Sequence, residues 1–431
     1  MTQRLFVCYV PGLDRRRLDP AVTPNVCALL ADRPSVVLDT LPSTELLPTM
    51  ITGVCPGEHG IWQVSHNDAA PARHWLDALP DGLTRAGQCM ANFLRPKMEL
   101  AAVPLSRRRR FHLHRFKYSR RADPAHAAAC LARFNGYDSV FGVLGEGGSR
   151  YHFGKCFQDL AGRVPQWPSG DVPLEMLEYY AFDLFSHWNL DRMDLVRPAM
   201  AETDRVIGQV RDNCRRKGVT FVLLVDHGQE LITGQTDLPA ALRRLGIPRA
   251  EYLYFLEVAV ARFWFFTPRA RAAITALLHE LPHVTVVPHT QMKQYHVDFP
   301  DARHGELYAY AHHGHAFFPH DFFEPLANVY LGLTMDGQHP RITNPRHRGN
   351  HGHLPGHPAE AGYLVVADER LRPTQGRPRA HIADVAPTLL TLLGREPAPH
   401  MKGAGIFAPF DRFHQAAPRA PVDSLVRSAT R

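Results

Sequence analysis

Two hydrophobic patterns alternate along the chain. Short apolar runs rich in β-branched residues, typical of buried strands, lie at residues 4–10, 35–41, 219–225, 283–288, 305–311 and 361–367. Amphipathic patterns typical of helices lie at residues 24–31, 193–214, 238–246 and 382–394. This alternation predicts an α/β fold with a mostly parallel central sheet and helices on both of its faces.

Length and composition favour a globular protein. A chain of 431 residues can bury a large core, either as one α/β domain with an insertion or as two domains. The longest apolar stretch, residues 252–266, is interrupted by Glu257 and Arg262, so we expect no membrane span. The first ten residues lead into a strand without the pattern of a signal peptide. The 7 cysteines show no CxxC pair, so a reducing, cytoplasmic compartment is expected.

Positive charge and histidine are both enriched. Much of the net charge of +7 lies in residues 106–121, where basic and aromatic residues interleave. That pattern occurs on nucleic-acid-binding surfaces, but a solvated face or a rim that attracts an anionic substrate is the more frequent explanation. Nucleic acid is therefore the less expected partner. The 26 histidines are densest between His304 and His357, which hints at metal binding by composition alone.

The strand-like run 219–225 ends in Asp226, His227 and Gly228. Ligands of open α/β sheets bind beyond the carboxyl ends of the strands, so a carboxylate and an imidazole there suit a metal or a phosphate. A turn with a capping Asp and a solvated His is the alternative. Asp183 and His187 have the i, i+4 spacing of one helix face, and His351 and His353 flank Gly352 in a loop before residues 361–367.

Ser43 and Thr44 follow the strand-like run 35–41, where a strand gives way to a helix. A hydroxyl at such a place can act as a nucleophile if a base or a metal lowers its pKa. Ser and Thr are also frequent helix N-caps, so the pattern alone leaves both roles open.

The order of these motifs resembles the alkaline phosphatase superfamily, in particular its nucleotide pyrophosphatase/phosphodiesterase branch. The resemblance rests on a hydroxyl before "TG" and "PGEHGI", then "DLFSH", "VDHG", "GNHGH" and "DVAPTLLTLLG", and it spans about Leu5 to Gly405. It implies a catalytic core at residues 1–228 and 346–410, an inserted cap or substrate subdomain at residues 229–345, and a loose tail at residues 411–431.

The resemblance also implies two divalent metal ions. Asp183, His187 and His351 would hold one ion, and Asp226, His227 and the nucleophile would hold the other, together with an Asp from the first strand. Imidazole and carboxylate ligands suit Zn²⁺, with Mn²⁺ as the alternative. Counting back from Thr52 and Gly53 without a gap makes Ser43 the nucleophile, whereas Thr44 has the usual residue type but needs a shift of one residue. Asn67 is the candidate for an oxyanion-binding side chain.

The implied activity is that of a phosphodiesterase or pyrophosphatase. The substrate would be a small phosphorylated molecule, such as a nucleotide or a phosphodiester, and the reaction would pass through a phospho-enzyme. A phosphomonoesterase of the same superfamily and a non-catalytic protein that binds a phosphate ligand are the alternatives. A sulfatase is disfavoured, because the segment at Cys55 lacks the required Arg.

One departure from the family lies in the first strand. Pro11 stands where the family's metal-binding Asp belongs, and Pro cannot bind a metal. Asp14 is the only nearby carboxylate that could replace it. We therefore expect unequal metal sites, with the Asp183 site filled first.

Overall fold

A seven-stranded sheet forms the centre of the molecule in the computed structural model, which describes residues 4–67, 100, 103, 105–114, 116, 123–322, 346–374 and 379–409. The strand order is β20-β2-β18-β9-β1-β8-β7. The bounds of these strands are β1 Leu5–Tyr9, β2 Ser35–Asp39, β7 Ser149–Gly154, β8 Leu174–Tyr179, β9 Thr220–Val225, β18 Gly362–Val366 and β20 Arg379–His381. All neighbouring pairs are parallel except those of β18, which runs antiparallel to β2 and β9.

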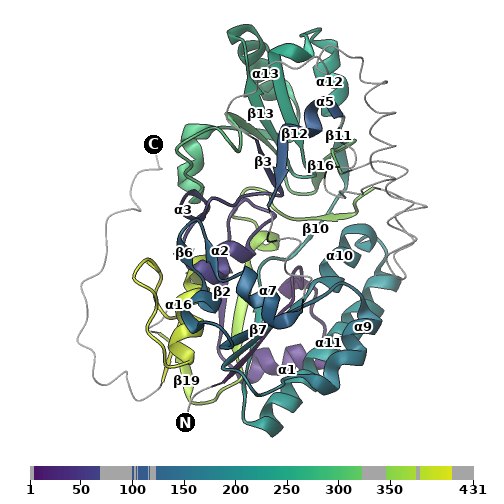
Figure 1. Ribbon diagram of the computed structural model, residues 1–431. Coiled ribbons are helices and arrows are strands. Elements are labelled where there is room, and N and C mark those ends of the chain that lie inside the picture. The colour runs from purple at the N-terminus through teal and green to yellow at the C-terminus, as the bar shows by residue number, and fades with distance from the viewer. Residues whose placement is uncertain are drawn as a thin grey trace, which may run out of the picture.

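Helices cover both faces of this sheet, as predicted (Figure 1). Alternate residues of β1 point to opposite faces, so Leu5 and Val7 belong to one apolar core and Phe6 and Cys8 to another. The first core includes α2 Leu47–Thr52, α7 Pro124–Cys130, α8 Val140–Leu144 and α16 Val385–Leu392. The second includes α1 Pro24–Asp32, α9 Phe157–Arg163, α10 Tyr180–Asn189 and α11 Met193–Lys217.

A second sheet lies at the top of Figure 1, and its four strands are antiparallel. Its order is β12-β13-β15-β14, with bounds β12 Tyr252–Leu256, β13 Val260–Phe265, β14 Val284–Pro288 and β15 Leu307–Ala311. Together with α12 Leu238–Arg244 and α13 Pro268–Glu280 it encloses an apolar core of its own. The long apolar stretch is thus a β-hairpin, and the Arg262 guanidinium lies 3.1 Å from the Glu257 carboxylate inside it.

The second sheet lies within the predicted insertion, whose boundaries at residues 229–345 stay a prediction. Residues 323–345 and the predicted tail at residues 411–431 lie outside the described residues. The remaining short elements are α3 Pro56–His59, α5 Leu105–Arg108, β3 Ser65–Asn67, β4 Phe111–Leu113, β5 Arg133–Phe134, β6 Tyr137–Asp138, β10 Glu230–Leu231, β11 Gly234–Thr236, β16 His315–Phe317, β17 Gly349–Asn350, β19 Leu371–Pro373 and β21 Phe407–Pro409. No helix within the described ranges is both long and apolar enough to span a bilayer.

Candidate active site

Sheet topology brings the predicted site residues to one edge. β8, β1 and β9 are parallel neighbours, so their carboxyl ends meet there. Asp183 follows β8 in the first turn of α10, and Asp226 and His227 follow β9. β18 is antiparallel and begins at this same edge, so the loop that precedes it carries His351 to the other three residues.

These side chains and His187 form a continuous cluster, which is buried except for the partly exposed His187. Nε2 of His187 lies 3.5 Å from Oδ2 of Asp183, and Nε2 of His351 lies 4.0 Å from Oδ1 of the same carboxylate. The rings of His351 and His227 stack with centroids 3.5 Å apart, and Nε2 of His227 is 3.3 Å from Oδ2 of Asp226. Ligand atoms of Asp183, His227 and His351 all lie within 4.8 Å of one another.

The hydrogen bonds of two histidines fix which nitrogen is free. Nδ1 of His187 donates to the carbonyl oxygen of Gly349 at 2.9 Å, and Nδ1 of His227 donates to that of Gly228 at 2.8 Å. A carbonyl oxygen can only accept, so Nδ1 carries the proton and Nε2 keeps its lone pair. Metal-binding histidines show this arrangement.

The charges in the cluster are strongly coupled. Burial raises the pKa of Asp183, but the nearby rings of His187, His351 and His227 outweigh it, and the pKa lies well below its usual range. Burial raises the pKa of Asp226, while His227 and the Tyr9 hydroxyl act in the opposite direction. Two carboxylates in a buried pocket require compensating positive charge, which a divalent cation supplies.

Both candidate nucleophiles lie beside the His351 loop. A Cβ placed on Gly352 would meet Cγ2 of Thr44 at 3.1 Å and the carbonyl carbon of Ser43 at 3.5 Å, and the φ of Gly352 is +81°. Oγ of Ser43 accepts a hydrogen bond from the Glu45 amide at 3.0 Å. Oγ1 of Thr44 donates to Oε1 of Gln63 at 2.8 Å.

The structure pairs Asp14 with an arginine. The Arg16 guanidinium donates to both oxygens of the Asp14 carboxylate at 2.6–3.1 Å, and Oδ1 also accepts from the Arg16 amide at 2.9 Å. Among the described residues, Asp14 is in none of the clusters that could hold a metal. The Asp14 side chain lies against the backbone that follows His227, because a Cβ on Gly228 would meet its Cγ at 2.7 Å.

The end of β1 packs against the cluster without supplying a carboxylate. Gly12, which follows Pro11, has a φ of +74°, and a Cβ there would approach Oδ1 of Asp183 to 2.7 Å. The Tyr9 hydroxyl donates to Oδ2 of Asp226 at 2.5 Å. Only glycine fits this backbone approach and this positive φ at once.

Asn67 lies on a different element from the cluster. It is the last residue of β3, and its amide donates to the Arg303 carbonyl at 2.8 Å. Oδ1 of Asn67 is buried without a hydrogen-bond partner in the described part of the chain. Within the described part of the chain, no hydrogen bond or ion pair joins Asn67 to Asp183 or to the histidines of the cluster, so its role in substrate binding stays a prediction.

Several residues that the sequence motifs did not indicate support the cluster. Nε2 of Gln229 donates to Oδ1 of Asp183 at 2.5 Å. The buried Glu360 carboxylate accepts from Nδ1 of His353 and from the Gly352 amide, both at 2.9 Å, which holds the loop that carries His351. The sequence could have indicated Gln229, because this residue directly follows the "VDHG" motif. No sequence motif marks Glu360 as a supporting residue.

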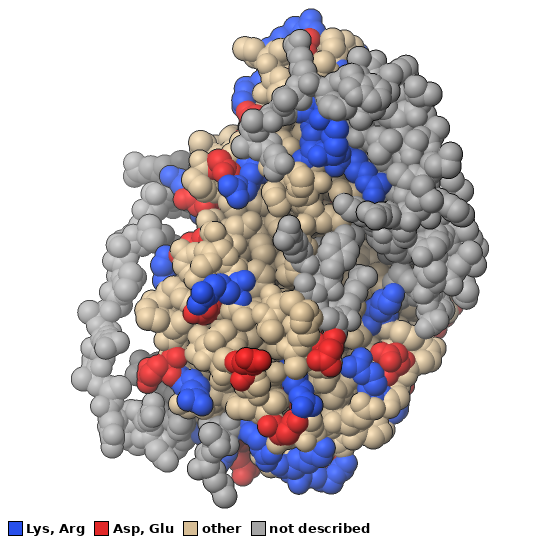
Figure 2. Space-filling model, viewed as in Figure 1, with Lys and Arg blue, Asp and Glu red and all other residues tan. Residues whose placement is uncertain are grey.

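The arginine-rich segment is partly structural. The Arg107 guanidinium lies 2.8 Å from Oδ1 of Asp321 and donates to the Tyr254 carbonyl at 2.8 Å. On the face shown in Figure 2, acidic and basic side chains are interspersed over the lower half. Residues 115 and 117–122 of this segment lie outside the described residues.

The fold is alkaline phosphatase-like. Among solved structures, the chain is similar to murine ectonucleotide pyrophosphatase/phosphodiesterase 5 (TM-score 0.60, 15% identity, covering 92% of this chain and 97% of the other). It is equally similar to an inactive variant of the murine protein in complex with AMP (0.59, 15%, 92% and 96%) and to the human protein (0.59, 16%, 93% and 97%).

Sequence comparison adds no relative. No protein-family model and no curated protein matches the chain. The predicted resemblance to the nucleotide pyrophosphatase/phosphodiesterase branch is confirmed by the structures, and at 15–16% identity this likeness establishes the fold.

Proposed function

We propose that the protein is a metal-dependent phosphoric ester hydrolase of the phosphodiesterase or pyrophosphatase type. The observation that carries this proposal is the buried carboxylate–imidazole cluster beside two hydroxyls at the carboxyl edge of the sheet. The fold supports it, because the similar solved structures are nucleotide pyrophosphatase/phosphodiesterases and one of them was solved with AMP. Small nucleotides or phosphodiesters are the proposed substrates, and a cytoplasmic location stays a prediction.

The residues of the cluster fit a divalent metal. Asp183, His187 and His351 would hold one ion, with Zn²⁺ as the proposed metal because of the imidazole ligands. Asp226 and His227 would contribute to a second ion. When bound, such ions lower the pKa of a hydroxyl nucleophile and neutralise phosphoryl oxygens.

The protein's own groups position the reacting atoms. The side-chain oxygen of Ser43 or Thr44 attacks phosphorus and gives up its proton to solvent, while the ester oxygen leaves and takes up a proton. Water then displaces the phosphoryl group from that side-chain oxygen, which regains its proton and is restored as a hydroxyl. Oγ of Ser43 accepts a hydrogen bond from the Glu45 amide, so the hydroxyl proton of Ser43 points away from that amide. Gln229 holds the Asp183 carboxylate in place through Nε2. Phosphoryl transfer depends mainly on such positioning and charge neutralisation.

A single-metal protein is the second candidate, and the region around β1 favours it. Pro11 offers no carboxylate, Asp14 is occupied by Arg16, and one oxygen of Asp226 is bound by Tyr9. With only one tight ion, the chain would bind a phosphate ligand or hydrolyse monoesters rather than process diesters rapidly.

Hydrolysis of bis- and mono-p-nitrophenyl phosphate separates these candidates. We expect metal-loaded wild type to cleave the diester, and Asp183→Asn to lose at least about 100-fold in kcat/KM together with bound metal. Asp159→Asn is the matched control, because this exposed Asp of α9 is paired only with Arg163 on the surface. Metal binding with cleavage of the monoester alone would favour the phosphomonoesterase, and metal binding without turnover would favour the binding protein.

A further inference from the structure

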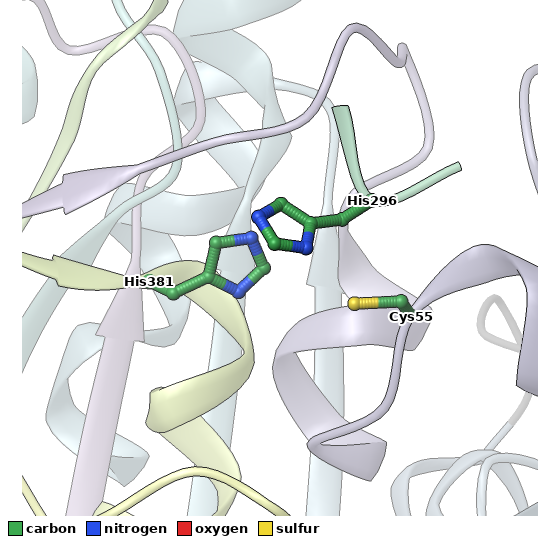
Figure 3. Close-up of side chains that lie close together, drawn as sticks. All are labelled: Cys55, His296 and His381. Carbon is green, nitrogen blue, oxygen red and sulfur yellow. The ribbon is translucent and has the colours of Figure 1, made fainter. Parts of the chain in front are cut away.

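A second group of metal-ligating side chains lies away from the candidate active site. Cys55 caps the N-terminus of α3, His296 ends the 3-10 helix His289–Tyr295, and His381 is the last residue of β20. Figure 3 shows the thiol and the two imidazoles turned toward one another. One ligand atom from each side chain lies within 4.8 Å of the other two, and the imidazole centroids are 4.7 Å apart.

We propose that Cys55, His296 and His381 form a binding site for a transition-metal ion of the Zn²⁺ class that fastens the second-sheet segment to the central sheet. His296 follows β14 of the second sheet, whereas His381 ends β20, an edge strand of the central sheet, and Cys55 lies at the start of α3. The site is independent of the proposed hydrolase activity, because it shares no residue with the candidate active site.

The backbone around the three side chains is held closely together. A Cβ on Gly57, in α3, would lie 1.8 Å from the Asp298 carbonyl oxygen, so these two segments touch through their main chains. His296 has a φ of +60°, a left-handed conformation that is uncommon for residues other than glycine. Strained backbone of this kind often accompanies binding sites.

The local chemistry leaves the ligand atoms available. Nε2 of His381 is buried without a hydrogen-bond partner among the described residues. Burial, and then the neighbouring His296, lowers the pKa of His381 to about 4, so this imidazole is neutral near pH 7. Burial, and then Glu58, raises the pKa of the Cys55 thiol to about 11, so the thiol keeps its proton until a cation replaces it.

Metal binding at this site requires a defined movement of protons. Nδ1 of His381 accepts a hydrogen bond from the Ala383 amide at 3.2 Å, so Nε2 carries the proton in the metal-free protein. Binding moves that proton to Nδ1 by exchange with solvent, at the cost of this one long hydrogen bond, and releases the Cys55 thiol proton to water. The ion gains one Cys55 sulfur bond and two imidazole nitrogen bonds, and no electron is transferred.

The donor set selects the class of metal. One thiolate and two imidazoles favour Zn²⁺ or Co²⁺ over Mg²⁺ and Ca²⁺, which prefer oxygen ligands. His296 is exposed, so the fourth coordination position faces solvent and is open to water. The ion links chain segments that are far apart in sequence, so we expect it to raise the melting temperature of the protein.

Titration of the metal-free full-length protein with Co²⁺ tests this site directly. Only a thiolate ligand gives the near-ultraviolet sulfur-to-cobalt charge-transfer band, and the candidate active site contains no cysteine. We expect a band whose final intensity corresponds to one thiolate-bound cobalt per chain in wild type and in Asp183→Asn, although the candidate active site also takes up Co²⁺ in wild type, and no band in Cys55→Ser or His296→Ala. Cys130→Ser is the matched control, because Cys130 is also half-buried beside a histidine, with its Sγ 3.4 Å from Nε2 of His126.

Two results would overturn the proposal. One is the absence of the band in wild type, and the other is a band that survives in Cys55→Ser. His296→Ala guards against misfolding, because this exposed side chain can be removed without opening the core. In the same variants, added Zn²⁺ should raise the melting temperature of wild type and Cys130→Ser more than that of His296→Ala, in which only the candidate active site is left to bind the ion. An equal rise in His296→Ala would count against the site.

Discussion

At the scale of single residues, the end of β1 determines how much negative charge faces the candidate metal centre. Pro11 stands where the resemblance would place a metal-binding Asp, and Gly12 brings the backbone against Asp183. The sequence singled out Asp14 as the substitute, but the structure binds its carboxylate to Arg16. From residue type alone, an Asp that pairs with an Arg two residues later cannot be distinguished from an Asp that binds a metal.

We expect the two metal sites to differ in affinity for this reason. In wild type, calorimetric titration with Zn²⁺ should show one tight ion and one weak ion. Pro11→Asp restores a carboxylate at the strand end and should tighten the second ion by at least about 10-fold. Two equally tight ions in wild type would contradict unequal sites.

Asp14→Asn separates the ion pair from a ligand role. The number of bound ions should stay the same, because the carboxylate faces Arg16. The free energy of unfolding should fall by about 1–2 kcal/mol through loss of charged hydrogen bonds on a guanidinium that is partly solvated. Metal analysis measures the number of bound ions, and chemical denaturation measures the free energy of unfolding. Loss of one ion at unchanged stability would show that Asp14 is a metal ligand.

The nucleophile is a choice between adjacent residues. We expect Ser43→Ala to abolish hydrolysis of the diester and Thr44→Ala to leave measurable turnover. The reason is that the Thr44 hydroxyl is already engaged, because it donates a hydrogen bond to Gln63. Metal content should be nearly unchanged in both variants, since the Asp and His residues remain. If Thr44→Ala is the inactive variant, the one-residue shift of the family alignment is correct, and full activity of the double variant would exclude a covalent intermediate.

At the scale of elements, apolar pattern predicted the strands that matter most for the site. The runs that became β1, β2, β9 and β18 were found, and so were the helices α1, α11, α12 and α16. β8 escaped prediction because Glu175 and Glu178 lie buried in it, with Glu175 held by His152 and by the Ser169 amide. The antiparallel direction of β18 was not predictable either, because a hydrophobic run carries no sign of its direction.

His59 links α2 and α3 and should make stability depend on pH. Its Nδ1 accepts from the Ile61 amide at 3.2 Å, its Nε2 bonds Oγ1 of Thr49 at 2.9 Å, and burial lowers its pKa to about 3. The unfolded chain binds a proton below about pH 6.5 while the folded one does not, so stability falls as the pH drops from that value toward 3.

This dependence should be absent in His59→Asn, which cannot titrate. Between pH 7 and pH 5, the difference in unfolding free energy between wild type and variant should shrink by about 2 kcal/mol. Urea denaturation at both pH values measures it. A difference that stays constant would mean that His59 is not buried as a neutral ring.

At the scale of the whole molecule, part of the positive net charge is used for contacts within the fold. Arg107 is occupied by Asp321 and a backbone carbonyl, and its side chain is 14% exposed. The remaining charge should attract polyanions without specificity, as Coulomb attraction does for any basic protein.

We therefore expect weak binding of single-stranded DNA, with a Kd of about 10⁻⁴ to 10⁻⁶ M at physiological salt and a steep loss as salt rises. Fluorescence anisotropy should show that charge reversal of Arg109 and Arg110 weakens binding no more than reversal of Arg215 and Arg216, at the end of α11. Nanomolar binding that depends on Arg109 and Arg110 alone would establish a nucleic-acid site.

The position of β18 also bears on how the chain folds as it is made. Residues 362–366 leave the ribosome well after β2 and β9, yet they occupy the gap between these two strands in the middle of the sheet. Until they emerge, two apolar strands present open edges, which are prone to pair with other chains. We therefore expect fragments that end before β18 to aggregate, and fragments that include it to stay in solution.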